Sequence, residues 1–168
     1  VGGWRALKRF ALWQINHQAW RVIDNGRTSQ TNDAYGGDET IHTTNNAVSF
    51  SLLQRLRQLV GSPLVGPYSV LLSSKDMKGA YRQMPVKDAQ VKYSIVCVFV
   101  PHLNAWRFCK LWGLAFGLAS AVIQFNRFPT LLCAIARRWL ALPLVAFFDD
   151  FKLTELKADG TNSGWRSF

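Results

Sequence analysis

The chain has 168 residues, enough to bury the core of one domain and too few for a multidomain enzyme. Its 20 lysines and arginines outnumber its 10 aspartates and glutamates and extend from Arg5 to Arg166, which favours a polyanionic partner such as nucleic acid; a merely basic soluble protein would have the same balance. Three cysteines and three histidines offer no CxxC pair and no zinc-ligand spacing, so we expect reduced, buried thiols in an intracellular protein of the cytoplasm or nucleus.

The first third of the chain is expected to alternate between apolar and polar segments. Residues 4–24 are rich in tryptophan and apolar residues and are interpreted as a helix followed by a strand. Residues 26–46 are rich in Thr, Asn, Gly, Asp and Ser, which is typical of a long connection. Apolar residues at helical spacing then predict a helix over residues 49–60, closed by Gly61.

Strands and hairpins are predicted in the middle of the chain. Residues 68–72 form an apolar run that leads to Asp76 and indicates a buried strand. Residues 93–100 and 105–111 are rich in β-branched and aromatic residues and flank the turn 101–104, so they are expected to pair as a hairpin.

A long helix and a second hairpin are predicted toward the end. Residues 118–142 are the best helix candidate, with a kink or break at Pro129. Residues 144–148 and 151–153 are expected to pair as antiparallel strands across Asp149–Asp150. This order of elements predicts an α+β fold in which helices cover one face of a small antiparallel sheet.

One uncharged stretch, residues 111–125, requires a test for a membrane span. Its fifteen residues are interrupted by Gly113 and Gly117 and fall short of the roughly 20 needed to cross a bilayer. A buried turn followed by a helix fits better, and neither a membrane partner nor a membrane-associated apolar protein is favoured.

Three aspartates stand where strands are expected to end. Asp149 and Asp150 lie between apolar residues, where uncompensated charge is costly, and Asp76 follows the strand 68–72. If these strands are neighbours, the three carboxylates could hold the two Mg²⁺ ions of a phosphoryl-transfer site. Taken alone, the pair is more often an exposed turn, and Asp76 is equally consistent with a helix N-cap.

Four sequence segments, taken together and in their order along the chain, favour a metal site over an exposed turn or a helix N-cap. They are Trp20–Asp24 with Arg27, Asp76–Pro85, Phe116–Ala121 with Phe125–Arg127, and Phe147–Phe151. Together they resemble the fingers and palm of a retroelement reverse transcriptase over residues 18–155. The resemblance implies an α+β polymerase palm with partial fingers and template-directed DNA synthesis by two-metal nucleotidyl transfer.

The resemblance also implies a role for each matching residue. Asp76 and Asp149 would coordinate two Mg²⁺ ions, or Mn²⁺, with Asp150 completing the site and Met77 contributing its backbone carbonyl. Tyr81 would lie beneath the sugar and favour deoxynucleotides, whereas an ordinary core aromatic is the alternative. The nucleotide-binding positions would be Arg21, Arg27, Lys78, Ala80, Tyr81, Phe116 and Gly117.

Three segments with different roles follow from the resemblance: residues 1–67 as partial fingers with the polar connection, 68–155 as the palm with the catalytic motifs, and 156–168 as a polar tail. The thumb and the ribonuclease H domain cannot be built from this chain, and a longer polyprotein is expected to supply them. The expected partners are an RNA or DNA template-primer and deoxynucleoside triphosphates, with weak or absent polymerisation by this chain alone.

Two alternatives to a reverse transcriptase remain open. The first is the palm of an RNA-dependent RNA polymerase, which shares the paired aspartates but usually places Gly before them, where this chain has Phe148. The second is a noncatalytic basic module that binds nucleic acid without Mg²⁺ and releases it as salt rises.

Overall fold

The computed structural model describes residues 4–35, 37–60 and 69–157, and the fold is α+β. Two compact units divide the chain, and both are discontinuous in sequence: the first unit is Val1–Thr40 with Gly79–Phe125, and the second is Ile41–Lys78 with Asn126–Phe168. The ranges 1–67, 68–155 and 156–168 divide the chain by expected function, and that division stays a prediction. Residues 158–168 of the expected tail lie outside the described residues.

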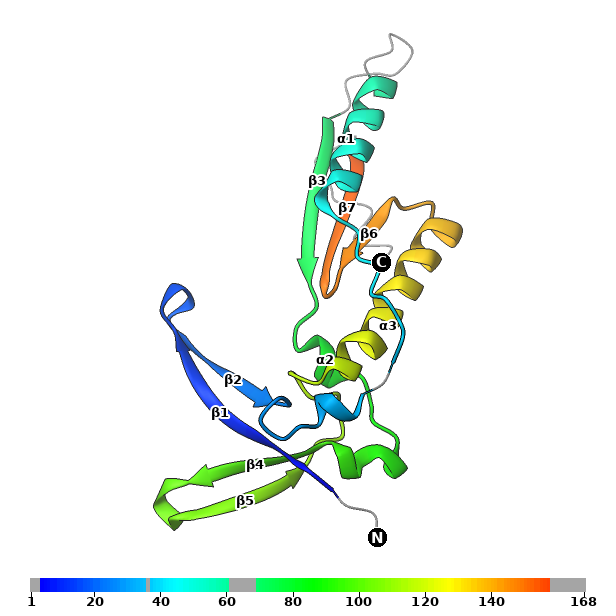
Figure 1. Ribbon diagram of the computed structural model, residues 1–168. Helices are drawn as coiled ribbons and strands as arrows, with labels where there is room; N and C mark the ends of the chain where they lie inside the picture. The colour runs from blue at the N-terminus through cyan, green and yellow to red at the C-terminus, as the bar shows by residue number, and fades with distance from the viewer. Residues whose placement is uncertain (1–3, 36, 61–68, 158–168) are drawn as a thin grey trace. The chain divides into compact units, whose positions relative to one another are not determined.

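The first unit is built on a four-stranded sheet of order β2-β1-β4-β5 (Figure 1). Strands β1 (Ala6–Gln14) and β2 (Ala19–Asn25) form an antiparallel hairpin through the 3₁₀ turn η1 (Ile15–His17). Strands β4 (Ile95–Val100) and β5 (Ala105–Lys110) form a second hairpin through η4 (Pro101–Leu103), as expected from the sequence. The two hairpins are joined by parallel pairing of β1 with β4.

The helix expected at the start of residues 4–24 is wrong, because these residues form the hairpin β1–β2. Leu7 is fully buried in β1, opposite the buried Val96 of β4. The main partner of β1 is the adjacent β2, and the pairing with β4 adds a segment nearly ninety residues further along the chain, which local composition does not indicate.

Irregular segments and short helices complete the first unit. The long polar connection is confirmed: its described residues up to 45 form turns and loops, and the one helical element among them is the 3₁₀ helix η2 (Asn32–Ala34). The unit also contains α2 (Ala80–Gln83) and the 3₁₀ helix η3 (Asp88–Tyr93). A bridge between Pro85 and Gly113 ties the segments on either side of the second hairpin. The buried apolar residues here are Ala80, Tyr81, Val91, Ala115, Leu118, Ala121 and Phe125.

The second unit is a three-stranded antiparallel sheet of order β3-β7-β6, with helix α1 alongside (Figure 1). Its strands are β3 (Ser69–Asp76), β6 (Leu144–Phe147) and β7 (Asp150–Lys157), and α1 (Asn46–Val60) contacts both β3 and β7. The predicted helix 49–60 and the hairpin across Asp149–Asp150 are therefore confirmed, with α1 beginning three residues earlier. A buried cluster of Cys133, Ala136, Leu144, Phe151 and Leu153 forms the core.

Helix α3 (Ala119–Trp139) runs from the first unit into the second. The helix predicted at 118–142 is confirmed, but the expected break at Pro129 is wrong because α3 continues through it. Proline removes one N–H donor from a helix. Pro129 is buried, and the Thr130 hydroxyl donates to the Asn126 carbonyl at 2.8 Å, so packing and local bonds hold the helix through this turn.

Two further expectations concern thiols and membranes. Cys133 is buried, but Cys97 is only half-buried and Cys109 is exposed on β5, which corrects the expectation of three buried thiols. Cys109 stands in β5, an edge strand whose residues are nearly all exposed. Within the described part of the chain, no helix combines the length and apolar character needed to cross a bilayer.

Candidate active site

The three predicted aspartates meet at one end of the second unit's sheet. Asp76 is the last residue of β3 and Asp150 is the first of β7, and the two are direct partners in the antiparallel register. Directly opposed residues have Cβ atoms about 5 Å apart and point to the same face. The Met77 backbone N–H donates to the Asp149 carbonyl at 2.9 Å, which brings the third aspartate beside the first. The hypothesis that the two strands are neighbours is therefore confirmed.

A two-residue loop holds Asp149 in place. Phe147 and Asp150 pair across the β6–β7 hairpin, so only Phe148 and Asp149 form the turn. Phe148 has φ of 55°, a left-handed conformation that costs a bulky residue about 1–2 kcal/mol. The rings of Phe147 and Phe148 pack edge to face at 5.0 Å. Tight two-residue hairpin loops place a positive φ at this first loop position.

The side chains of the aspartates are adjacent without forming a closed ligand cluster. Among residues 4–35, 37–60 and 69–157, no three acidic, histidine or cysteine side chains are grouped so as to hold a metal ion. Asp76 is exposed, and Asp149 and Asp150 are half-buried, so all three carboxylates have contact with solvent. Like charges directly across a strand pair repel by a few tenths to about 1 kcal/mol. A cation between them would remove this repulsion.

Comparison with known proteins identifies no family for this chain. The chain matches no protein-family model. A search of curated proteins also finds no match. The case for any function therefore rests on the residues of this chain.

Tyr81 is held in the first unit between two phenylalanine rings. Its ring centroid is 4.5 Å from that of Phe116 and 4.5 Å from that of Phe125, and the latter pair is nearly parallel at 28°. Tyr81 is only 8% exposed, and its neighbour Ala80 is buried. The described position is that of a packed aromatic, and contact of Tyr81 with a sugar stays a prediction.

Gly117 is required by a close approach of two backbone segments. It has φ of +92°, and a Cβ at this position would lie 1.9 Å from the Asp24 carbonyl oxygen. The motif was expected to need glycine so that backbone could approach a ligand. The structure provides another reason, which is contact with the end of β2.

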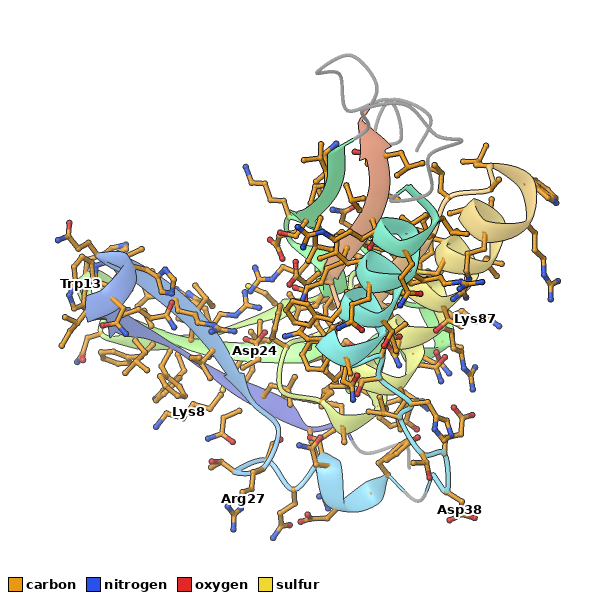
Figure 2. The ribbon with its side chains drawn as sticks, turned by 90° about the horizontal axis from the view of Figure 1, so that it is seen from above. Lys8, Trp13, Asp24, Arg27, Asp38 and Lys87 are labelled. Atoms are coloured by element: carbon orange, nitrogen blue, oxygen red, sulfur yellow. The ribbon has the colours of Figure 1, made fainter. Side chains whose placement is uncertain are left out.

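Arg21 is brought to the same group from β2. Its guanidinium carbon lies 5.9 Å from the centre of the Phe116 ring, within the range of a weak cation–π contact. Segments nearly one hundred residues apart in sequence therefore place Arg21, Tyr81, Phe116 and Gly117 together. Arg27 is not part of this group, because its side chain points away from the ribbon into solvent (Figure 2). Lys78 is exposed and belongs to the second unit with the aspartates.

An ion pair that the sequence did not indicate fixes the end of β2. Arg9 donates two hydrogen bonds to Asp24, at 2.6 and 3.0 Å, and the Asp24 side chain is completely buried. The hydrogen bond to Asp24 raises the pKa of the Arg9 guanidinium above its usual value. Arg9 is therefore engaged with Asp24. Lys8 is exposed on the opposite face of β1 (Figure 2).

Asn32 is a further residue of this region that the sequence did not indicate. Its side-chain amide donates to the Gly117 carbonyl, and its oxygen accepts from the Ala119 backbone N–H, both at 2.9 Å. One amide thus satisfies the turn at Gly117 and one of the free N–H groups at the start of α3. Asparagine in a polar loop has many uses, so its type and position alone do not predict this contact.

Proposed function

We propose that this chain is a nucleotidyl-transfer palm with partial fingers, of the reverse transcriptase kind, which extends DNA on a nucleic-acid template. The observation that supports it most is the register of β3 with β7, which sets Asp76 opposite Asp150 and Met77 against Asp149. Two antiparallel neighbouring strands and a tight hairpin bring the three carboxylates to one end of the sheet, where they can supply hard oxygen ligands.

The donor set fits divalent magnesium. Asp76, Asp149 and the Met77 carbonyl supply only oxygen atoms, which Mg²⁺ prefers, and the opposed carboxylates of Asp76 and Asp150 repel unless a cation lies near. When bound, Mg²⁺ would lower the pKa of an attacking hydroxyl and neutralise developing charge on phosphate. Asp76 and Asp149 would hold it, and Asp150 would complete or tune the site.

The residues of the first unit fit recognition of a deoxynucleoside triphosphate. Arg21 is exposed and rests against Phe116, so its guanidinium is oriented and still able to donate to phosphate oxygens. Tyr81, fixed between Phe116 and Phe125, is a rigid wall suited to excluding a 2′-hydroxyl. Ala80 and Gly117 would contribute backbone beside the nucleotide, and Arg27 would be an outer phosphate contact. Lys78 of the second unit would be another.

The test combines metal binding with primer extension. Mn²⁺ binding to the full chain is followed by electron paramagnetic resonance, and extension of a DNA primer on RNA is followed with Mg²⁺ and deoxynucleotides. Asp149→Asn should abolish tight Mn²⁺ binding and reduce to background the weak extension that this chain alone is expected to support. The control Asp38→Asn removes the same charge from an exposed, irregular segment and should change neither (Figure 2). Equal behaviour of the two variants would refute the proposal.

A specific surface favours a second candidate, nucleic-acid binding without catalysis. We call one face of the four-stranded sheet the aromatic-basic face. The strand register places on it Lys8, Phe10, Arg21, Phe99, Trp106, Phe108 and Lys110. All seven side chains are exposed, with Trp106 at 48% and Phe108 at 57%. Aromatic rings among basic residues suit stacking of single-stranded bases with contacts to the phosphates.

This second candidate differs from the first in its requirement for metal. Trp106→Ala should weaken binding of a single-stranded oligonucleotide about tenfold in EDTA, because stacking of one base contributes about 1–3 kcal/mol. Asp149→Asn should leave that binding unchanged. If oligonucleotide binding requires both Mg²⁺ and Asp149, the noncatalytic candidate fails and the polymerase proposal gains support.

A further inference from the structure

A cavity in the second unit lies between the start of α1 and the β3–β7 pair. It has a volume of about 230 Å³, and its lining includes Asn46, Ser49 and Phe50 of α1 with Ser74 of β3 and Lys152 of β7. A water molecule has a share of about 30 Å³ in the liquid, so this space has room for a group of several heavy atoms. All of these residues belong to one compact unit.

Ser49 provides the observation that points to a ligand. The residue is 2% exposed, it lines the cavity, and its Oγ has no hydrogen-bond partner among the described residues. A buried hydroxyl without a partner costs about 1–3 kcal/mol, so such groups are normally satisfied. A ligand oxygen in the cavity would accept the Ser49 hydroxyl proton.

The charge around the cavity selects an anion. Lys152 is the one charged residue in the described lining, and its Nζ donates one of three N–H bonds to Asn46 Oδ1, which orients the ammonium. Asn46 and Ser49 lie in the first turn of the 15-residue helix α1, where the helix dipole presents partial positive charge. Hydroxyl, amide and ammonium donors around one space are a set that a phosphate group can use.

The cavity is also aligned with the aspartates. Ser74 and Lys152 are opposed in the β3–β7 register, two residues before Asp76 and two after Asp150. Alternate residues of a strand share a face and are separated by about 7 Å. A strand of nucleic acid that contacted the aspartates would therefore pass within reach of Lys152.

We propose that this cavity binds a phosphate group, supplied by the backbone of a nucleic-acid strand, through Lys152, Ser49 and Asn46. Neither bound metal nor catalysis is required, so the site can exist whether or not the chain polymerises DNA. Free inorganic phosphate offers the same oxygen atoms and is the other source to be distinguished.

The experiment measures oligonucleotide binding by the full chain in EDTA. Fluorescence anisotropy of a fluorescein-labelled thymidine dodecanucleotide is recorded over a range of salt for Lys152→Met, Ser49→Ala and Lys75→Met. Lys75 precedes Asp76 on β3 and alternates to the face opposite Ser74, so Lys75→Met removes the same charge as the matched control. Circular dichroism melts establish that each variant folds.

Lys152→Met should raise Kd about tenfold and reduce the slope of log Kd against log salt by about 0.7, since one phosphate contact is lost. Ser49→Ala should raise Kd about threefold without changing the slope, because the hydroxyl has no charge. Lys75→Met should change Kd less than about twofold. Equal effects of Lys152→Met and Lys75→Met, with no effect of Ser49→Ala, would overturn the proposal.

A second arm distinguishes the two sources of phosphate. Amide NMR signals of Asn46 and Ser49 in the ¹⁵N-labelled chain are followed with the unlabelled dodecanucleotide and, separately, with inorganic phosphate at constant ionic strength. Shifts with the oligonucleotide assign the site to a nucleic-acid backbone, and shifts with inorganic phosphate alone assign it to the free ion and overturn the backbone source. No shift with either refutes the site, and Asp149→Asn, which tests the polymerase, should leave these shifts unchanged.

Discussion

Replacing Gly117 with alanine will destabilise the first unit far more than the same replacement at Gly79. Both glycines have positive φ, +92° and +66°, which costs an alanine about 1–2 kcal/mol. At Gly79 a new Cβ meets nothing within 4 Å. At Gly117 it would lie 1.9 Å from the Asp24 carbonyl oxygen, so the end of β2 must move, at a further cost of about 1–3 kcal/mol.

The Asp24 backbone cannot move without disturbing its neighbours, because the Asp24 carboxylate is completely buried and paired with Arg9. We therefore expect a loss of about 3 kcal/mol or more for Gly117→Ala and about 1 kcal/mol for Gly79→Ala. Urea unfolding followed by tryptophan fluorescence measures both, since most tryptophans belong to the first unit. If the two losses agree within about 0.5 kcal/mol, the contact between Gly117 and β2 is not what requires glycine.

Three other replacements follow from the contacts of the first unit and the core of the second. Arg9→Met should lower the free energy of unfolding by about 3 kcal/mol in urea, because it leaves the buried Asp24 carboxylate without its partner; a loss below about 1 kcal/mol would contradict this. Asn32→Ala should cost about 1–2 kcal/mol by the same measurement, since two hydrogen bonds at 2.9 Å are lost, and no change would mean that water replaces both. Burial raises the pKa of the Cys133 thiol, so the folded state favours its neutral form. The resulting contribution to the free energy of unfolding is complete below the ordinary pKa of 9.0 and is lost as pH rises through the pKa of the folded state. Iodoacetamide at pH 8 should accordingly modify the exposed Cys109 quickly and Cys133 only after unfolding, as read by mass spectrometry, and equal rates would show that Cys133 is accessible.

Local signals in the sequence were sufficient for most elements and insufficient for one strand. Apolar residues at helical spacing predicted α1 and α3, and turn residues between β-branched runs predicted the hairpins, because both patterns lie within a few residues. Strand β1 was missed although its main partner β2 follows directly in the chain, and its second partner β4 is remote. Pro129 predicted a break because a single proline is strongly unfavourable in a helix, but burial on both sides of it holds α3 together.

The candidate site likewise combines residues that the sequence predicted with contacts that only the fold reveals. Asp76 and the pair Asp149–Asp150 could be predicted from their positions after apolar strands, but whether those strands pair is a tertiary fact that the β3–β7 register provides. The grouping of Arg21 with Phe116 depends on how β2 meets the turn at Gly117, and no periodicity records it. Ser49 looked like one more residue of a helix, and only its burial without a partner distinguishes it.

The length of the Phe148–Asp149 loop decides whether the aspartates can act together. Phe148 adopts φ of 55° at a cost of about 1–2 kcal/mol, while its edge-to-face contact with Phe147 returns about 0.5–1.5 kcal/mol, so the loop is held at little net expense. With two loop residues, Asp150 is the partner of Phe147 on one side and of Asp76 on the other. A shift of one residue in this register would turn Asp150 to the opposite face of the sheet. Asp149 and Asp150 can therefore act together with Asp76 only because this turn sets the register that places Asp150 opposite Asp76.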